Sequence, residues 1–340
     1  MNAPVPQMIS VIIPLYNGAD TIAGVLAALA GQTTARQFEI IVVDDQSNDG
    51  GDRLVRPPVR LLHQQNAGPA AARNHGARQA NGDLLLFLDS DCTPTPNWVE
   101  DMARAIETSG FDAVMGTLIA ANDGVVPRLV QLEVEDRYRG MAAASDGVDF
   151  IAAPSCGVKR DVFTQLGGFD ERLRQAEDVE FAYRLTAAGH KIAFVQTAPV
   201  AHAHQTTWRA FLKTKYVRAA GRLRVFRLFP QKRRQDTWTP LSFKLQFAAV
   251  ALSVPALLLA LVLGGVWWAI LVALIMAAIL LGAPLVLATA RRQRDLIGFV
   301  PGLFVGAGFV LIRSAIILAA MLRSKLPRFP DRKNGGAGSP

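Results

Sequence analysis

Cysteine is scarce in this chain, and its scarcity excludes a fold held together by disulfides. Cys92 and Cys156 are the two cysteines among 340 residues. Small secreted domains rely on several disulfide pairs, so this composition fits a reducing compartment. Residues 1–7 also lack the basic and apolar regions that make up a signal peptide. We therefore expect the N-terminal part of the chain to lie in the cytosol.

Acidic side chains are scarce in the C-terminal part. Residues 205–340 hold 20 Lys and Arg against 3 Asp and Glu, a net charge of +17, whereas residues 1–204 hold 16 against 25, a net charge of −9. A basic segment can bind nucleic acid or anionic lipid. Because long apolar runs accompany these basic residues, we expect membrane lipids as the partner and no nucleic acid.

Charged side chains are absent altogether from residues 245–290, a run of 46 residues. One transmembrane helix needs about 20 apolar residues, so this run predicts two. We place these spans at about 245–264 and 266–290, within a helical membrane region over 243–325. Gly264-Gly265 would form the turn between them.

A third apolar run covers about 296–322 and is interrupted by Arg313. A lone arginine at membrane depth is costly, so a helix here has to shield it or carry it to the interface. The run is a third candidate span, and its topology stays open. A cytosolic front with several spans predicts a multi-pass protein of the cell membrane.

The segment 206–235 joins the two parts and is strongly basic. Residues 208–234 contain ten Lys and Arg and no acidic residue, and apolar residues recur there at spacings of three and four. This pattern predicts an amphipathic helix lying in the interface of an anionic membrane leaflet. The alternative is a surface helix that packs on the neighbouring domain.

Residues 1–205 read as one α/β domain. Apolar runs at 8–15, 39–43 and 83–88 have the composition of buried strands, and helical periodicity separates them near 19–30 and 67–79. Buried strands alternating with helices predict a mostly parallel sheet of the Rossmann type, covered on both faces. In such sheets ligands bind beyond the carboxyl ends of the strands.

Two carboxylates follow the third of these strands, at Asp89 and Asp91. Residues two apart in an extended chain can reach one hard cation, and Mg²⁺ or Mn²⁺ prefers such oxygen ligands and shares them with phosphates. Alone this pattern is weak, because solvated turn carboxylates are common.

Five further motifs accompany it in a defined order. The chain reads VIIPLYN at 11–17, VVDDQSNDG at 42–50, NAGPAAARNHG at 66–76, LDSD at 88–91, GGFDE at 167–171 and AEDVEFAYRLTAAGH at 176–190. Together they resemble the family-2 glycosyltransferases of the GT-A fold, over roughly residues 8–205. The resemblance implies a catalytic domain that binds a nucleotide-diphosphate sugar, with UDP as the first expectation.

For the donor, the resemblance implies a binding site at the strand ends. Asp44 or Asp45 would accept a hydrogen bond from the base; the alternative is an Asx turn leading into Gly50-Gly51, and the two roles could coexist. The other residues expected in this site are Pro14, Tyr16, Asn17, Gly68, Arg73 and Asp89. For Arg73, a salt bridge on a helix surface is the alternative.

For metal and catalysis, the resemblance implies Asp91 as a ligand of Mg²⁺ or Mn²⁺, with Asp89 beside it and His204 as a further candidate. Asp178 would be the base that takes the acceptor proton, and Glu177 would orient the acceptor. The segment Gly167, Gly168, Phe169 and Asp170 would shape the acceptor pocket.

These features predict an inverting hexosyl- or related transferase. It would act on an acceptor hydroxyl of a lipid-linked or membrane-proximal molecule at the cytosolic face, for cell-envelope, polysaccharide or glycolipid synthesis. A processive polysaccharide synthase is the alternative, although the QxxRW motif typical of such enzymes is absent. A non-catalytic membrane scaffold is the alternative from another class.

Overall fold

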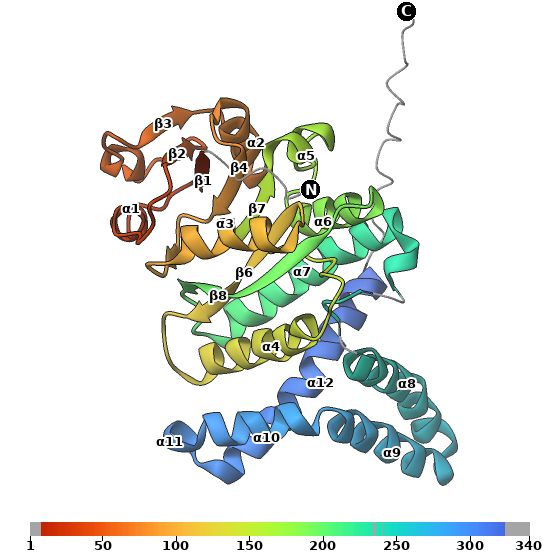
Figure 1. The fold of residues 1–340 in the computed structure, drawn as a ribbon. Helices are drawn as coiled ribbons and strands as arrows, with labels where there is room; N and C mark the ends of the chain where they lie inside the picture. The colour runs from red at the N-terminus through yellow and green to blue at the C-terminus, as the bar shows by residue number, and fades with distance from the viewer. Residues whose placement is uncertain (1–7, 234–235, 240, 324–340) are drawn as a thin grey trace, which may run out of the picture.

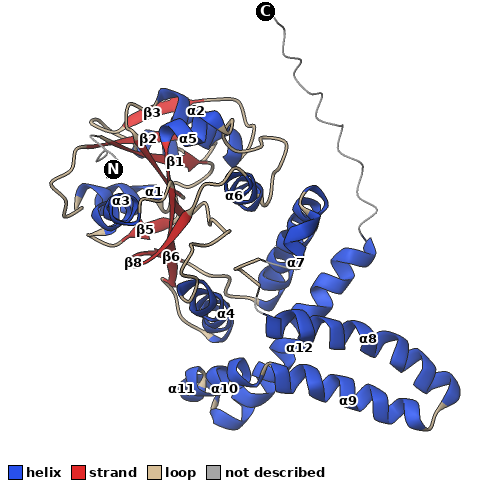
Figure 2. Ribbon diagram, turned by 45° about the vertical axis from the view of Figure 1, so that its right-hand side comes forward, coloured by secondary structure: helices blue, strands red, loops and turns tan. Residues whose placement is uncertain are grey.

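The computed structural model describes residues 8–233, 236–239 and 241–323. The outermost residues of the predicted segments, at 1–7, 234–235 and 324–325, lie outside these ranges. Within them the chain forms an α/β domain followed by a group of apolar helices (Figure 1). A long helix, α7, lies between the two parts in both views (Figure 2).

One sheet organises the α/β domain, with its eight strands in the order β3-β2-β1-β4-β7-β6-β8-β5. In chain order the strands are β1 (Ile9–Leu15), β2 (Phe38–Asp44), β3 (Arg60–His63), β4 (Leu84–Leu88), β5 (Cys92–Pro94), β6 (Ala113–Ala120), β7 (Ser155–Lys159) and β8 (Ile192–His202). The strands β3, β2, β1 and β4 pair in parallel, as the apolar runs predict. The pairs β4–β7, β6–β7 and β5–β8 are antiparallel, so the sheet as a whole is mixed. An apolar run does not encode the direction of its strand, which is why the sequence did not reveal these pairs.

Seven helices belong to this part of the chain. They are α1 (Ile22–Ala30), α2 (Pro69–Gln79), α3 (Trp98–Ser109), α4 (Val125–Ala142), α5 (Arg160–Gln165), α6 (Glu177–Ala187) and α7 (Trp208–Leu228). Neighbouring residues of β1 contribute to separate cores, Ile12 to one and Ile13 to the other, and both are fully buried. This is the arrangement expected when both faces of a sheet are covered. It leaves the carboxyl ends of the central strands free to carry polar loops.

The apolar helices differ from the predicted spans in one respect. They are α8 (Leu241–Leu263), α9 (Val266–Leu281), α10 (Ala283–Arg292), the short α11 (Arg294–Ile297) and α12 (Phe299–Arg323). By length and composition α8 and α12 can each cross a membrane, whereas α9 and α10 are bent by 62° at Gly282. The predicted span 266–290 is therefore a broken helix, and the third apolar run forms one continuous helix. Pro284 sits in the first turn of α10, where its missing N–H costs nothing.

The charge of Arg313 is shielded inside this group of helices. Its side chain is 6% exposed. The guanidinium donates a hydrogen bond to Gln246 on α8 and lies 4.5 Å from the centre of the Phe243 ring. A polar partner and an aromatic face compensate part of the cost of burying this charge.

The basic helix α7 packs against α12 on one side and against α4 on another. Phe211 and Val225 are fully buried, and the Phe211 ring lies 5.7 Å from that of Phe309 on α12. On the other side Lys215 pairs with Glu133 of α4. Trp208 and Leu212 stay exposed. Contact of this exposed face with lipid remains a prediction.

Close packing of α10 against α12 depends on glycine. A Cβ atom at Gly306 would lie 2.9 Å from the Cα atom of Val286, whereas one at Gly308 would meet nothing within 4 Å. Small residues four apart commonly let two membrane helices approach in this way, and Gly302 precedes Gly306 by one turn.

We expect Gly306→Ala to destabilise the helical region by about 1–3 kcal/mol, because the added methyl group has to push a backbone aside. Thermal unfolding of the full chain in detergent measures this effect. Gly308→Ala is the matched control on the same helix, and we expect it to be neutral or slightly stabilising. Equal effects of the two substitutions would contradict the packing described here.

Candidate active site

A cleft of about 1050 Å³ opens between the carboxyl ends of β1 and β4 and the helices α6, α7, α8 and α12. Nine of the predicted site residues line it: Pro14, Tyr16, Asp45, Gly68, Arg73, Asp89, Asp91, Glu177 and Asp178. They come from segments up to 164 positions apart in the sequence, Pro14 and Asp178 being the most distant. The folded chain therefore brings most of the predicted site together in one place.

The two aspartates that follow β2 take different positions. Asp45 faces the cleft, and its carboxylate accepts hydrogen bonds from the backbone N–H groups of Ala67 and Gly68, both at 2.9 Å. Asp44 instead lies beside β3, where its carboxylate accepts from the N–H of Ser47 and meets His63. Asp45 thus holds the loop that enters α2, in which Gly68 has a φ of 95°.

Two other predicted elements are not among the described residues that line the cleft. Asn17 joins the loops after β1 and β2, because its side-chain oxygen accepts a hydrogen bond from the N–H of Asn48. The segment Gly167, Gly168, Phe169 and Asp170 forms a turn behind the site. Asn74 exchanges two hydrogen bonds of 2.9 Å with the backbone of Phe169, whose ring is buried in the core. This segment supports α2 rather than forming a wall of the cleft.

Arg73 lies at the centre of the site and joins its two acidic pairs. Its guanidinium donates to Asp89 at 2.5 Å and to Glu177 at 2.9 Å, and the residue is only 3% exposed. From the sequence we expected Arg73 either to contact the donor or to form a salt bridge on the helix surface. Neither role included this bridge, because no motif links residues as far apart in the chain as 73 and 177. An arginine that donates to two different carboxylates in this way fixes their positions relative to each other.

Glu177 and Asp178 begin α6, after Ala176 in the left-handed conformation with a φ of 65°. Asp178 borders the cleft, and its carboxylate accepts hydrogen bonds from the N–H groups of Ala153 at 3.2 Å and Val179 at 2.8 Å. Burial, assisted by the neighbouring charge of Asp178, raises the pKa of Glu177 to about 6, and burial also raises the pKa of Asp178. A carboxylate with a raised pKa is a better proton acceptor at neutral pH.

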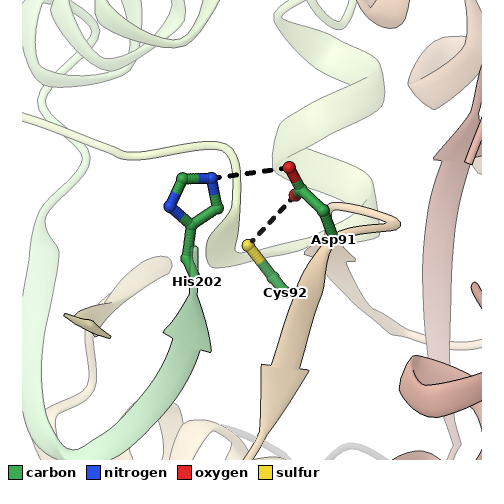
Figure 3. A group of neighbouring side chains, drawn as sticks. All are labelled: Asp91, Cys92 and His202. Carbon is green, nitrogen blue, oxygen red and sulfur yellow. Dashed lines mark hydrogen bonds and ion pairs between the residues drawn. The ribbon is translucent and has the colours of Figure 1, made fainter. Parts of the chain in front are cut away.

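Asp91 has His202 and Cys92 as neighbours (Figure 3), and the candidate ligand atoms of the three lie within 4.8 Å of one another. The imidazole Nε2 atom of His202 is 3.4 Å from the Asp91 carboxylate, and this contact lowers the pKa of Asp91. Burial raises the pKa of the Cys92 thiol, and hard cations such as Mg²⁺ and Mn²⁺ prefer oxygen ligands to sulfur. Asp91 and His202 are thus the pair whose chemistry fits a divalent cation here.

The residue that contacts Asp91 is His202 rather than the expected His204. The Nε2 atom of His204 is 3.0 Å from the side-chain oxygen of Gln131, and its Nδ1 atom is 3.5 Å from that of His202. Both ring nitrogens therefore have neighbours within the protein. The strand β8 ends at His202, so His204 lies in the segment that follows it, and the sequence pattern His-x-His could not show which histidine lies beside Asp91. The geometry favours His202.

The other end of the cleft holds residues that sequence reasoning did not assign to the site. Basic side chains of α7, among them Lys215, Arg218 and Arg222, line it together with apolar residues of α8 and α12. We expected these basic residues to face lipid. Their spacing of three and four along the helix was the available signal, because it places them on one face.

Comparison with known proteins identifies the family. The sequence model of glycosyl transferase family 2 matches residues 10–167. Glycosyltransferase AglE of Haloferax volcanii is 30% identical over 232 residues, which cover 65% of this chain and 74% of that protein. The chain belongs to glycosyl transferase family 2. The pre-mycofactocin glycosyltransferase of Mycobacterium tuberculosis is 29% identical over 231 residues, which cover 63% of this chain and 46% of that protein.

The fold of this family-2 glycosyltransferase is GT-A. The mannosyltransferase PcManGT from Pyrobaculum calidifontis, solved in complex with GDP-Man and Mn²⁺, superposes with a TM-score of 0.53 at 20% identity, covering 93% of this chain and 88% of that one. The family and the fold confirm that the protein is a glycosyltransferase with apolar C-terminal helices that could span a membrane. In this glycosyltransferase the cleft brings together the carboxylates that follow β2 and β4 and those that begin α6.

Proposed function

We propose that this glycosyltransferase moves a sugar from a nucleotide diphosphate to an acceptor hydroxyl, with inversion at the anomeric carbon. One observation carries the proposal: Asp91 and Asp178 line the same cleft although they come from different parts of the fold. Inverting transfer needs a proton acceptor on the side of the anomeric carbon opposite the leaving diphosphate. The cleft contains Asp91, a candidate ligand for the cation that would stabilise the leaving diphosphate, and Asp178, a separate carboxylate that could accept the proton.

The donor would lie at the sheet end of the cleft. Asp45, Tyr16 and Pro14 border the place expected for the base, and Asp45 has its carboxylate already oriented by the 67–68 backbone. Arg73 would bring positive charge toward the diphosphate while it holds Asp89. UDP is our first choice of nucleotide. GDP is the nucleotide bound by the archaeal mannosyltransferase of the same fold, and it is the second.

The site fits a divalent cation. Contact with His202 lowers the pKa of Asp91, which favours the carboxylate form, and the Asp91 side chain is half exposed. Asp91 and His202 would hold Mg²⁺ or Mn²⁺, with Asp89 nearby. When bound, the cation neutralises the diphosphate that departs.

Asp178 would act as the base. As the acceptor oxygen bonds to the anomeric carbon, the bond from that carbon to the diphosphate oxygen breaks, and the diphosphate leaves with the electron pair. The proton of the acceptor hydroxyl passes to the Asp178 carboxylate. Glu177 would be kept in place by Arg73 and would orient the acceptor.

The acceptor would be lipid-linked or close to the membrane. The cleft is bordered by α8 and α12, the two helices that are long and apolar enough to cross a bilayer. A catalytic domain that faces the cytosol would then meet an acceptor in the adjacent leaflet. This placement suits the synthesis of glycolipids or of cell-envelope polysaccharides.

Nucleotide release from a panel of nucleotide sugars, with Mg²⁺ or Mn²⁺, tests the proposal. We expect one donor to be turned over and EDTA to abolish the turnover. We expect Asp91→Ala to lower turnover by about 10²-fold, because the diphosphate loses electrostatic stabilisation. Asp146→Ala is the matched control, because the Asp146 side chain is 96% exposed and lies outside the cleft lining. Turnover that is unaffected by EDTA and by Asp91→Ala would contradict the proposal.

A further inference from the structure

The segment 149–154 borders the cleft just before β7, and it is irregular yet largely buried. Its residues from Phe150 to Ala153 are each at most 7% exposed. A buried segment outside a helix or strand has to find hydrogen-bond partners for its backbone elsewhere in the fold. The contacts at its two ends therefore determine where this segment lies.

The C-terminal end of the segment contacts the carboxylate of Asp178. The backbone N–H of Ala153 donates to one Asp178 oxygen at 3.2 Å, and the N–H of Val179 donates to the other at 2.8 Å. The bond from Val179 stays within α6, whereas the bond from Ala153 ties the carboxylate to another part of the domain. A donor of this kind orients a carboxylate and favours its ionised form. The orientation of Asp178 therefore depends on where Ala153 lies.

The N-terminal end of the segment is bound to the connector between α7 and α8. Thr237 donates to the Asp149 carboxylate from its backbone N–H at 2.7 Å and from its hydroxyl at 2.6 Å. The hydroxyl oxygen in turn accepts a hydrogen bond of 3.0 Å from the backbone N–H of Asp149. Lys232 lies 2.7 Å from the same carboxylate, and Asp149 is only 8% exposed. Residues of the connector thus compensate a buried charge at the start of the segment.

Trp238 of the connector adds an aromatic contact in the middle of this arrangement. Its ring stacks on that of Phe150, with the ring centres 3.8 Å apart and the planes 13° from parallel. The guanidinium of Arg137 on α4 lies 4.6 Å from the centre of the Trp238 ring. Stacking and a cation over the ring both restrict where an aromatic side chain can lie. Because α8 begins at Leu241, Trp238 joins the segment 149–154 to the start of a helix that could span a membrane.

We propose that Trp238 is a positioning residue for Asp178: by stacking on Phe150 it holds the segment 149–154 where the Ala153 N–H meets the Asp178 carboxylate. This proposal rests on the proposed function, in which Asp178 takes the acceptor proton. It makes the geometry of the base depend on the connector that leads into α8. Correct packing of the membrane helices is then a condition for catalysis and not only for anchoring.

Nucleotide release by the full chain in detergent tests the proposal, with the donor selected by the panel and extracted membrane lipid as the source of acceptor. We expect Trp238→Ala to lower kcat by about tenfold or more and to leave donor affinity unchanged, because a misplaced base slows proton transfer without touching the nucleotide. Trp238→Phe keeps a ring that can stack on Phe150, so it should restore most of the turnover.

The acid limb of the kcat/KM profile is a second readout of the position of Asp178. Losing the Ala153 donor removes an interaction that lowers the pKa of Asp178, so the limb should move to higher pH by about one unit in Trp238→Ala. The charged groups beside Asp178 are Glu177 of α6, Arg73 of α2 and Arg218 of α7, and the substitution alters none of them. A purely structural role of Trp238 would lower thermal stability and leave this limb in place.

Hydrogen exchange of a peptide covering 149–154, measured by mass spectrometry, gives a readout that needs no turnover. We expect Trp238→Ala to speed exchange there by about tenfold, since the contacts that keep the segment closed are weakened. Thr237→Val removes the hydroxyl bonded to Asp149 at almost the same side-chain size. It should change kcat, the acid limb and exchange in the same direction by smaller amounts, and it replaces Trp238→Ala as the test if that variant does not fold.

Trp268→Ala is the matched control, since Trp268 lies on α9, is 46% exposed and is outside the cleft lining. It should match the wild type in kcat, acid limb and exchange. A raised half-saturating concentration of acceptor lipid in Trp238→Ala, with the acid limb and exchange unmoved, would make Trp238 an acceptor contact and overturn the positioning role. If Asp178→Asn is inactive but folded Trp238→Ala behaves as the wild type, this inference fails alone. If Trp238→Ala speeds exchange but Asp178→Asn keeps full turnover, the proposed function fails instead.

Discussion

Replacing Asp178 by Asn is expected to lower kcat by about 10³-fold, the loss typical of removing a general base. Asn is nearly the same size, and its amide oxygen can still accept one of the two hydrogen bonds that Ala153 and Val179 donate to different oxygens of Asp178. The fold and the affinity for the donor should therefore persist. Nucleotide release under saturating donor and acceptor measures kcat, and equilibrium binding of the donor is measured separately.

Asp146→Asn is the matched control for this substitution, because the Asp146 side chain is 96% exposed and lies outside the cleft lining. We expect it to keep wild-type turnover. The pH profile gives an independent check. Burial raises the pKa of Glu177 to about 6 and that of Asp178 in the same direction, so the acidic pair takes up protons as the pH falls through that range. Wild-type kcat/KM should be retained at higher pH and lost on the acid side. A D178N variant with full turnover would remove Asp178 from the mechanism.

Replacing Arg73 by Met is expected to destabilise the folded protein by about 3–5 kcal/mol at pH 8, the cost of leaving buried charge without its partner. Arg73 neutralises Asp89 and Glu177 together, and Glu177 is only 7% exposed. Without the guanidinium the pKa of Glu177 rises further above its unfolded value. The penalty is then present above that raised pKa and becomes smaller as the pH falls and Glu177 takes up a proton.

Denaturant unfolding of the full chain in detergent at pH 8 and pH 5.5 measures this difference. Arg78→Met is the matched control on the same helix. Its side chain is 63% exposed and 3.8 Å from Glu171, so we expect a change within about 0.5 kcal/mol. Arg73→Lys should recover only part of the stability, because one ammonium group cannot bridge two carboxylates as the planar guanidinium does. A penalty that is equal at both pH values would show that packing, rather than charge, makes Arg73 important.

The sequence was most informative where local patterns coincide with burial. The strands β1, β2 and β4 are continuous apolar runs that end at polar residues, so both their positions and the edge that carries the acidic motifs were predictable. The helix break at Gly282 was not predicted, because an apolar run has the same composition whether straight or bent. Gly282 and Pro284 were the local signals for it.

Long-range partners were the least predictable part of the site. The bridge from Arg73 to Glu177 spans 104 positions, and no spacing rule reaches so far. The choice of His202 over His204 depends on where β8 ends and how the chain turns after it, and the His-x-His pattern leaves that undecided. The basic residues of α7 were assigned to a lipid surface because a sequence does not show that Lys215 pairs with Glu133 of α4 or that Arg222 pairs with Asp236.

The two halves of the cleft come from stretches of chain that a single cut near residue 206 would separate. The acidic half is contributed by residues before that point and most of the basic, apolar half by residues after it. Under the proposed function, exchange of the C-terminal stretch between relatives would change the half of the cleft assigned to the acceptor and keep the half assigned to the donor. The junction before α7 is therefore the point at which we would join two family members in a designed chimera.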